Sequence, residues 1–518
     1  MPVAARRRTR IPAQGRTVSI PAPIGGWNAR DSAADMSKTD ALVLENWFPA
    51  PTYITLRNGY SKHVTGITGW VETIMAYVGG TTNKLFGAAT TKIYDVTTAG
   101  AVGAASVSSL TNARWQYVNN TTSGGSYLQA VNGADKMVVF DGSAWHKDGD
   151  GSPYDVTGVD SATCIGITLS HNRVWLTKVN SLKAFYGPTG SIGGAFSTLD
   201  LSSFCQRGGY LMAIADWTMD AGYGMDDMTV FITSEGEVLV YRGTDPASVT
   251  TWGLVGVFWI GSPIGRRCII KYQGDLLIIT QDGVQPMSLA MQASRGSPKI
   301  NITDKIQYAV SQAVSMYGSN YGWQLLVFPK ENMLFLNVPL LESNTQQQYV
   351  MNTITKTWCN FAGWDAACWE LYRDNPYFGG NGYVGKAWDT LSDNGGVIVG
   401  DALQAFSSYG SPGVNKQFTQ MRPVLNTNGT PVIAAKMNVD FDTSDPTSTV
   451  SFTPGGYAVW GTSLWDNANW GVGLTISQVW QGANGVGKWA APHLEATCSG
   501  FNLQWISTDV IWKPGGLL

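Results

Sequence analysis

The stretch YLQAVNGADKMVVFDGSAW at residues 127–145 contains two apolar runs separated by an Asn-Gly turn at 132–133, and an Asp-Gly turn follows at 141–142. Such pairs supply the positive φ angles that two-residue hairpin loops require. A second stretch, MTVFITSEGEVLVYR at 228–242, has apolar residues at alternate positions on both sides of its Glu-Gly turn at 235–236. This alternation predicts β-hairpins with one buried face.

The hairpin pattern recurs along the chain. Each copy has an apolar strand, a tight polar turn and a second apolar strand, and successive copies begin 42 to 59 residues apart. Repeats of roughly 40 to 50 residues, each forming one four-stranded sheet, are typical of β-propellers. The longer intervals leave about five to seven blades, and a pair of β-sandwiches is the alternative fold. The copies begin near residues 83, 127, 169, 228, 274, 331 and 375.

The segments that flank the repeats have a different character. The segment before them is extended and interrupted by prolines, whereas the segment after them contains long amphipathic strands. We therefore predict a mainly β protein with very few helices, in which a β-propeller at 66–400 is inserted into a β-rich platform domain. Residues 26–65 and 401–518 would form the platform, and residues 1–25 would form an extended basic arm.

Only two segments are predicted to be helical. Ser37 and Asp40 have the spacing of a capping box, and the following DALVLENWF would form a helix that stops at Pro49. Residues 304–317, with Thr303 as the cap, place their apolar residues on one helical face. The second helix is expected to pack on the sheets.

The composition is poor in charge and rich in aromatic residues. Charged residues make up 14% of the 518 residues, against about 25% in typical proteins. The chain contains 21 Trp and 21 Tyr. Either neighbouring subunits or partners cover much of the surface, or a propeller uses Trp heavily in its core. The net charge of −3 argues against a surface that binds nucleic acid or anionic lipid throughout.

Basic residues cluster only near the start of the chain, in Arg6, Arg7, Arg8 and Arg10. Such a cluster either contacts phosphate or an acidic partner, or is a solvated tail. No apolar leader follows it, and no stretch reaches the length of a membrane-spanning helix. We expect a protein without a membrane anchor that is made and folded in the cytosol.

No pattern predicts a catalytic, cofactor-binding or metal site. The six cysteines lack Cys-x-x-Cys spacing and are expected to be buried thiols, and the four histidines are too dispersed for a metal site. GANGVGK at 482–488 has P-loop spacing, but Trp489 stands where the Mg²⁺-binding Ser or Thr belongs. DGDGSPYD at 148–155 resembles the start of a calcium loop without its final Glu. A polar turn is the expected structure there, and adventitious Ca²⁺ binding stays open.

Four longer segments carry a family resemblance. They are IGGWNARDSAADMSKTDALVLENWFPAPTYITLRNGY (24–60), VFITSEGEVLVYRGTDPASVTTW (230–252), IGSPIGRRCIIKYQGDLLIITQDGVQPMS (260–288) and VMNTITKTWCNFAGW (350–364). Their sequences resemble those of the tail nozzle proteins of short-tailed bacteriophages, also described as tail tubular protein B or packaged-DNA stabilisation protein. The similarity extends from about residue 20 to residue 518, and it consists of short matching stretches of sequence rather than of invariant functional residues.

The resemblance implies a structural virion protein of the viral tail, a non-enzymatic homohexameric tube without cofactors. The tube would dock to the head-to-tail adaptor, hold tail fibres or spikes, retain packaged double-stranded DNA and gate its ejection. Six subunits of net charge −3 would carry about −18, which suits a conduit for DNA with one charge per about 1.7 Å. Glycine-rich loops at 187–194 and 482–487 are candidates for the gating movement.

The residues expected at the assembly interface lie mainly in a segment that lacks a core of its own. Aromatic and arginine side chains in such a region commonly become interface anchors. Trp47 and Phe48 have an alternative role, which is to pack a short helix against the C-terminal domain. The candidates, with the arginines of the basic arm, are Arg6, Arg7, Arg8, Arg10, Trp27, Arg30, Asp31, Trp47, Phe48 and Arg57.

Two other function classes compete with the structural one. A carbohydrate-binding, lectin-like propeller would use exposed Trp and Tyr to stack on sugars. A propeller hydrolase or quinone-dependent enzyme would need His, Asp, Glu or Arg side chains that converge on the central channel, and the few histidines argue against it.

Overall fold

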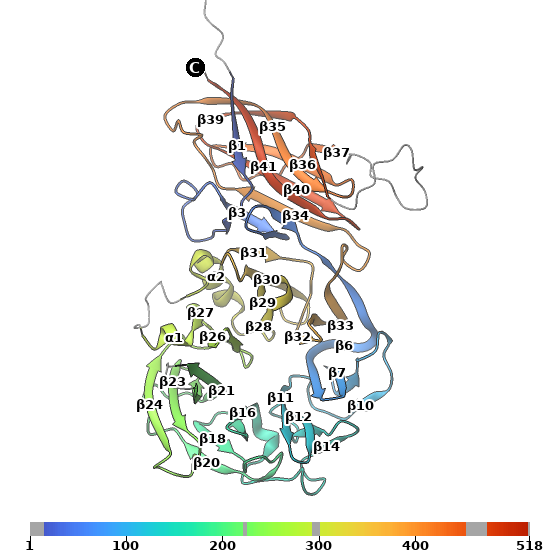
Figure 1. The fold of residues 1–518 in the computed structure, drawn as a ribbon, viewed down its shortest axis with the longest axis vertical. Helices are drawn as coiled ribbons and strands as arrows, with labels where there is room; N and C mark the ends of the chain where they lie inside the picture. The colour runs from blue at the N-terminus through green and yellow to red at the C-terminus, as the bar shows by residue number, and fades with distance from the viewer. Residues whose placement is uncertain (1–14, 221–224, 293–300, 452–473, 516–518) are drawn as a thin grey trace, which may run out of the picture. The chain divides into compact units, whose positions relative to one another are not determined.

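The computed structural model describes residues 15–220, 225–292, 301–451 and 474–515. The chain divides into two compact units (Figure 1). Unit 1 combines the chain up to Arg57 with the chain from Gly395 onward, and unit 2 is Asn58–Asn394. Unit 2 begins before the predicted residue 66, because its first strand already begins at Gly59.

Unit 2 is a seven-bladed β-propeller over the residues described, and Figure 1 looks onto the ring. The innermost strands contact one another in sequence around the axis, and they are β6, β11, β16, β21, β25, β28 and β32. The first blade contains β6 (Gly59–Gly79), β7 (Thr82–Ala89), β8 (Lys92–Asp95) and β10 (Ala105–Val107). The second contains β11 (Gln116–Thr122), β12 (Gly125–Val131), β13 (Val138–Phe140) and β14 (Trp145–Lys147). The third contains β16 (Cys164–Ser170), β17 (Arg173–Lys178), β18 (Lys183–Tyr186) and β20 (Ser197–Asp200).

The fourth blade contains β21 (Leu211–Asp220), β22 (Met225–Thr233), β23 (Glu237–Gly243) and β24 (Trp252–Trp259), and the fifth contains β25 (Ile269–Tyr272), β26 (Asp275–Thr280) and β27 (Gly283–Pro286). The sixth contains β28 (Gln324–Phe328), β29 (Met333–Leu341), β30 (Thr345–Asn352) and β31 (Trp358–Phe361). The seventh contains β32 (Trp369–Tyr372) and β33 (Asn375–Thr390). Short parallel bridges join β15 (Val156–Thr157) to β19 (Gly194–Ala195) and β9 (Gly100–Ala101) to β6. The seven predicted hairpins each fall at the second strand of a blade, so the propeller prediction is confirmed.

The ring closes through one pair of strands, β6 and β33. The second half of β6 pairs with β7 in the first blade, from Val71 to Gly79. Its first half pairs with β33 of the last blade, from Gly59 opposite Thr390 to Thr65 opposite Tyr383. A single strand from the start of unit 2 therefore completes the blade formed by its end.

Alternate residues of a blade enter two different cores. In β13, Val138 and Phe140 join the cluster shared with the first blade, whereas Val139 joins the cluster shared with the third. Each central blade packs between two neighbours, so both of its faces are buried. The prediction of a single buried face was wrong on this point, because alternation also suits a sheet whose two faces pack on different sheets.

The predicted helix after Ser37 is wrong. The backbone N–H of Asp40 does donate to Ser37 O at 2.8 Å, which makes a turn. The chain then continues as β3 (Asp40–Glu45) and β4 (Trp47–Pro49), with Asn46 between them at a φ of 60°. The β3 strand forms an antiparallel ladder with β34 (Ile398–Gln404), a distant partner that outweighs the local helix preference.

The second predicted helix is confirmed. A 3₁₀ turn at Asp304–Ile306 leads into α2 (Gln307–Tyr317), and Ile306, Val310 and Ala313 are buried. The Thr303 hydroxyl does not cap the helix but accepts a hydrogen bond from the Val284 N–H at 3.2 Å. Among the described residues, the other short helical segments are α1 (Met287–Ala290), Ser161–Thr163 and Pro329–Glu331. Among the residues described, no helix is both long and apolar enough to span a membrane.

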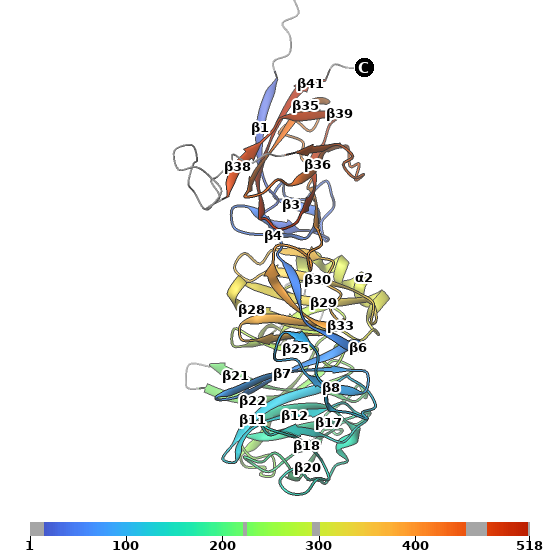
Figure 2. The same ribbon diagram turned by 90° about the vertical axis from the view of Figure 1, so that its right-hand side faces the viewer.

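Unit 1 is built from two sheets that draw on both ends of the chain, and Figure 2 shows β1 beside β41. Gly400 of β34 lies against Trp47 and Leu56 of the other sheet, and a Cβ there would come within 2.4 Å of Leu56 Cδ1. One sheet contains β1 (Arg16–Pro21), β4, β5 (Ile54–Leu56), β35 (Lys416–Thr427), β38 (Thr475–Gln478), β39 (Gln481–Gly487) and β41 (Leu503–Pro514). The other strands are β2 (Gly26–Trp27), β3, β34, β36 (Val432–Val439), β37 (Thr449–Ser451) and β40 (Ala490–Cys498).

The ring closure can be tested at Gly379 of β33. A Cβ at this position would lie 2.0 Å from the Val71 carbonyl oxygen of β6 and 2.7 Å from Cys368 Sγ. We expect Gly379→Ala to destabilise unit 2 by about 1–3 kcal/mol, because backbone atoms would have to move. The matched control is Gly253→Ala in β24, where no atom lies within 4 Å and a change within about 0.5 kcal/mol is expected. Urea unfolding midpoints measure both, and equal shifts would contradict the prediction.

Candidate functional site

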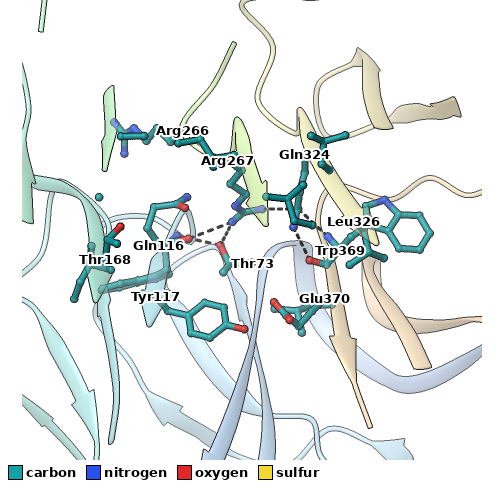
Figure 3. A pocket seen from close by; sticks show the side chains of 18 of the residues that line it. Thr73, Gln116, Tyr117, Thr168, Arg266, Arg267, Gln324, Leu326, Trp369 and Glu370 are labelled. Atoms are coloured by element: carbon teal, nitrogen blue, oxygen red, sulfur yellow. Dashed lines mark hydrogen bonds between the residues drawn. The ribbon is translucent and has the colours of Figure 1, made fainter. Parts of the chain in front are cut away.

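The innermost strands of unit 2 enclose an axial cavity of about 320 Å³ (Figure 3). Each of the seven blades contributes to its lining. In the view of Figure 3, Arg266 and Arg267 lie at one end, Tyr117 and Glu370 lie at the other, and Gln116 and Thr73 lie between them. The cavity is therefore lined by charged and polar side chains at the centre of a hydrophobic ring.

Arg267 joins four blades at one point. It precedes β25, and its Nη2 donates to Thr73 Oγ1 at 2.7 Å, Glu72 O at 3.0 Å and Trp115 O at 3.2 Å. Its Nη1 reaches Gln324 Oε1 at 3.4 Å. The fixed fork of a guanidinium can satisfy several acceptors at once, so Arg267 serves as an internal tie of the ring.

Gln324 extends this tie to the last blade. Its side-chain amide donates to Trp369 O at 2.7 Å and accepts from the Trp369 N–H at 3.0 Å. The side chain thus pairs with the backbone of β32 as a neighbouring strand would. A polar network with its members satisfied rigidifies the structure that contains it.

Ion pairs lie beside the arginine end of the cavity. Arg114 contacts Glu72 at 3.1 Å and also pairs with Glu342, and its guanidinium lies 4.4 Å from the centre of the Tyr321 ring. Burial lowers the pKa of Arg114, but the two carboxylates outweigh burial and raise it. Arg114 is held as a cation between acids, in contrast to Arg266.

Arg266 is held in the cavity wall with few partners. Its Nη1 donates to Asn132 O at 3.3 Å, and no carboxylate lies within 4.0 Å of it among the residues described. Burial lowers the pKa of Arg266. Gln116 on β11 also lines the cavity, and its buried Nε2 has no hydrogen-bond partner in the part of the chain that the structure describes.

Glu370 is the carboxyl group at the opposite end, beside Tyr117. Burial raises its pKa to about 7, although hydrogen bonds from Tyr117 and from the Leu371 N–H and the charge of Arg267 act in the opposite direction. The Leu371 N–H donates to Glu370 Oε1 at 3.2 Å. A carboxyl group with this pKa exchanges its proton near neutral pH.

The thiols and the calcium-loop-like segment at 148–155 take part in the packing and hydrogen bonding of the fold. Five of the six cysteines are buried and Cys205 is half-buried, and all six thiols are free. Burial raises the pKa of Cys164, Cys268, Cys368 and Cys498 to about 12. The 148–155 segment is a polar turn whose carboxylates accept protein hydrogen bonds, such as Ser161 Oγ to Asp148 Oδ2 at 2.6 Å.

The glycines of 482–487 do not form a loop. They belong to β39, which pairs with β35, and the next strand, β40, begins at Ala490. This strand context is not that of a P-loop, and it corrects the expectation of a gating loop here. The 187–194 loop is anchored, because Ile192 is buried and Ile192 O accepts from Gln129 Nε2 at 2.6 Å.

One group in unit 1 has ligand atoms close enough to share a cation, although no metal site was predicted. Single ligand atoms of Asp401, Asp445 and His493 lie within 4.8 Å of one another. His493 Nε2 and Asp401 Oδ1 are already 2.8 Å apart, which is hydrogen-bond distance. The arrangement is accounted for as a buried histidine held by a carboxylate.

The predicted assembly residues have different environments. Arg30 pairs with Asp31 at 2.8 Å near the surface, and Trp27 is half-buried in β2. Trp47 is fully buried and its ring centre lies 6.4 Å from that of Trp505 in unit 1, which corresponds to the alternative packing role. The other candidates are Phe48 and Arg57, which are buried, and Arg6, Arg7, Arg8 and Arg10, which lie outside the described residues.

Comparisons with known proteins assign this chain to no family. No family model matches the chain, and no curated protein sequence matches it. Among solved structures it is similar to BBS1N in complex with ARL6DN, with 9% identity, a TM-score of 0.39 and coverage of 65% of this chain and 99% of that chain. It is also similar to the Cps50 (Swd1) β-propeller domain of Myceliophteria thermophila, with 12% identity, a TM-score of 0.38 and coverage of 63% and 98%. Likeness at this level carries no argument.

The cavity residues were not singled out from the sequence. The adjacent arginines at 266–267 stand just before an apolar strand, and Glu370 is an acid in an otherwise aromatic and apolar run. These are signals of buried charge, but only the ring brings β11, β25 and β32 to one axis. Local patterns do not contain that information.

The raised pKa of Glu370 predicts a pH dependence of stability. The folded state holds this proton up to about pH 7, whereas the unfolded carboxyl has the ordinary pKa of 4.5, so the contribution to stability falls as the pH rises from about 4.5 to 7. Glu370 keeps some exposure to solvent, which moderates the effect, and we expect the stability of Glu370→Gln relative to wild type to increase by about 2 kcal/mol between pH 5 and pH 8. Thermal unfolding across this range measures the difference. The control is Glu235→Gln at an exposed position of the same unit, and parallel curves for wild type and Glu370→Gln would contradict the prediction.

Proposed function

We propose that this protein is a structural subunit of the tail of a short-tailed bacteriophage, forming a homohexameric nozzle that retains and releases double-stranded DNA. The observation that carries the proposal is the resemblance of the segments at 24–60, 230–252, 260–288 and 350–364 to tail nozzle proteins. The fold agrees with it in general terms, since a propeller is inserted between the two halves of a β-rich domain.

The construction of unit 1 supports a structural role. The β1 strand pairs with β41 over six residue pairs, from Arg16 opposite Trp512 to Pro21 opposite Ser507. Segments near the two ends of the described chain therefore share one sheet, and neither can leave without breaking a hydrogen-bonded ladder.

The charge distribution also supports the proposal. A hexamer with a net charge near −18 would not attract DNA electrostatically, so the genome could pass through the ring. The proposed partners are further copies of the chain, the head-to-tail adaptor, tail fibres or spikes and the DNA in transit. The virion tail is the proposed location, after synthesis in the host cytoplasm.

The first test is the oligomeric state of the purified protein. We expect particles of six times 55.8 kDa by mass photometry, and six-fold rings with an axial hole by electron cryomicroscopy. Well-behaved monomers that bind glycans would instead favour the carbohydrate-binding alternative. Closed rings are the outcome that the structural proposal requires.

The second test concerns the basic arm. Replacing its four arginines by alanine is expected to leave the unfolding midpoint unchanged, because the arm precedes β1, and to weaken ring formation or docking to the adaptor. The matched control removes the same charge from exposed lysines of unit 2. If both variants form rings and dock equally well, the arm has no assembly role. The variants replace Arg6, Arg7, Arg8 and Arg10, or Lys92, Lys147, Lys183 and Lys330.

A further inference from the structure

We propose that the axial cavity of unit 2 binds a small hydroxylated carboxylate, of the chemical class of sugar acids, through Arg266 and Gln116. This inference goes beyond the structural role and does not depend on it. The inference rests on three features of the cavity. These are its unused hydrogen-bond donors, the contrast between its arginine end and its Glu370 end, and its volume.

Arg266 has donors to spare. A guanidinium carries five N–H donors, and Arg266 makes a single hydrogen bond, to Asn132 O, among the residues described. Its neighbour Arg267 contacts four acceptors in the same wall. Arg266 is half-buried in this wall, and no carboxylate within the described residues neutralises it. The structure therefore holds a guanidinium ready for an anion.

Gln116 supplies a second unused donor. Its Nε2 is buried and unpaired among the described residues, which is costly unless a ligand or water accepts from it. Figure 3 shows Gln116 in the wall between the arginine end and Tyr117. A guanidinium fork together with an amide N–H is a suitable donor set for a carboxylate.

The far end of the cavity selects the rest of the ligand. Glu370 accepts hydrogen bonds there, and its partly ionised carboxyl would repel a second carboxylate while accepting a hydroxyl. A molecule with one carboxylate and several hydroxyls matches both ends. The volume of about 320 Å³ lies at the lower limit of typical ligand pockets, about 300–1,000 Å³, and suits a small molecule.

Isothermal titration calorimetry of the full chain with D-gluconate tests the proposal, with acetate as the minimal carboxylate and D-glucose as the neutral control. We expect D-gluconate to bind, acetate to bind more weakly and D-glucose not to bind. Arg266→Gln and Gln116→Leu should each weaken D-gluconate binding about tenfold or more, because each removes a donor to a charged group. Arg207→Gln is the matched control, since Arg207 is exposed and stacks on Trp259 at 4.4 Å.

Gln116→Leu keeps the test decisive if Arg266→Gln does not fold. Removing an unpaired buried donor should leave the unfolding temperature of the free protein unchanged or raised, while the stabilisation by D-gluconate is lost. Absence of D-gluconate binding at tens of millimolar would overturn the proposal. So would equal binding of D-glucose and D-gluconate, or D-gluconate binding that neither Gln116→Leu nor Arg266→Gln reduces.

Discussion

The pairing of β6 with β33 is the constraint on which unit 2 depends. Seven blades that met only through side chains would leave an open arc with two unpaired edges, and exposed edges invite pairing with other chains. The 21 residues of β6 are long enough to serve the first blade with one half and the last blade with the other. Backbone hydrogen bonds between segments more than 300 residues apart thus convert a linear series of hairpins into a ring. The entropy of closing so long a loop is compensated by the apolar contacts that each blade then makes on two faces.

Closing the ring also creates the polar axis. The innermost strands converge, and the side chains at their beginnings have to share a small volume. Arg267 resolves this crowding by contacting acceptors from three other blades, and Gln324 pairs with the backbone of a further one. Arg266 makes one hydrogen bond in this volume among the described residues, and burial shifts the pKa values of both Arg266 and Glu370 toward the neutral form. The axis therefore combines a satisfied scaffold with a few groups that are still free to act.

Much of the fold could be predicted from the sequence because hairpins are local. Gly133, Gly142 and Gly236 have the positive φ angles that the turn pairs required. The loops are longer than two residues, since Asn132 Oδ1 accepts from the Ala134 and Asp135 N–H groups and extends the first turn. The segment after Ser37 failed as a helix because its partner strand lies more than 350 residues away. The cavity was missed for a similar reason. Arg266, Gln116 and Glu370 lie in one cavity only because three blades meet at the axis of the ring, and the spacing of these residues along the chain does not indicate this.

The position of Arg267 has a consequence for how unit 2 comes apart. Linear repeat proteins can fray from their ends, because each repeat contacts only its neighbours. In unit 2 one guanidinium is shared by the first, second, fifth and sixth blades, so the opening of any of these four removes a partner from the others. Amide protons of the innermost strands should accordingly exchange with solvent at a common rate set by global unfolding, without a gradient from one blade to the next.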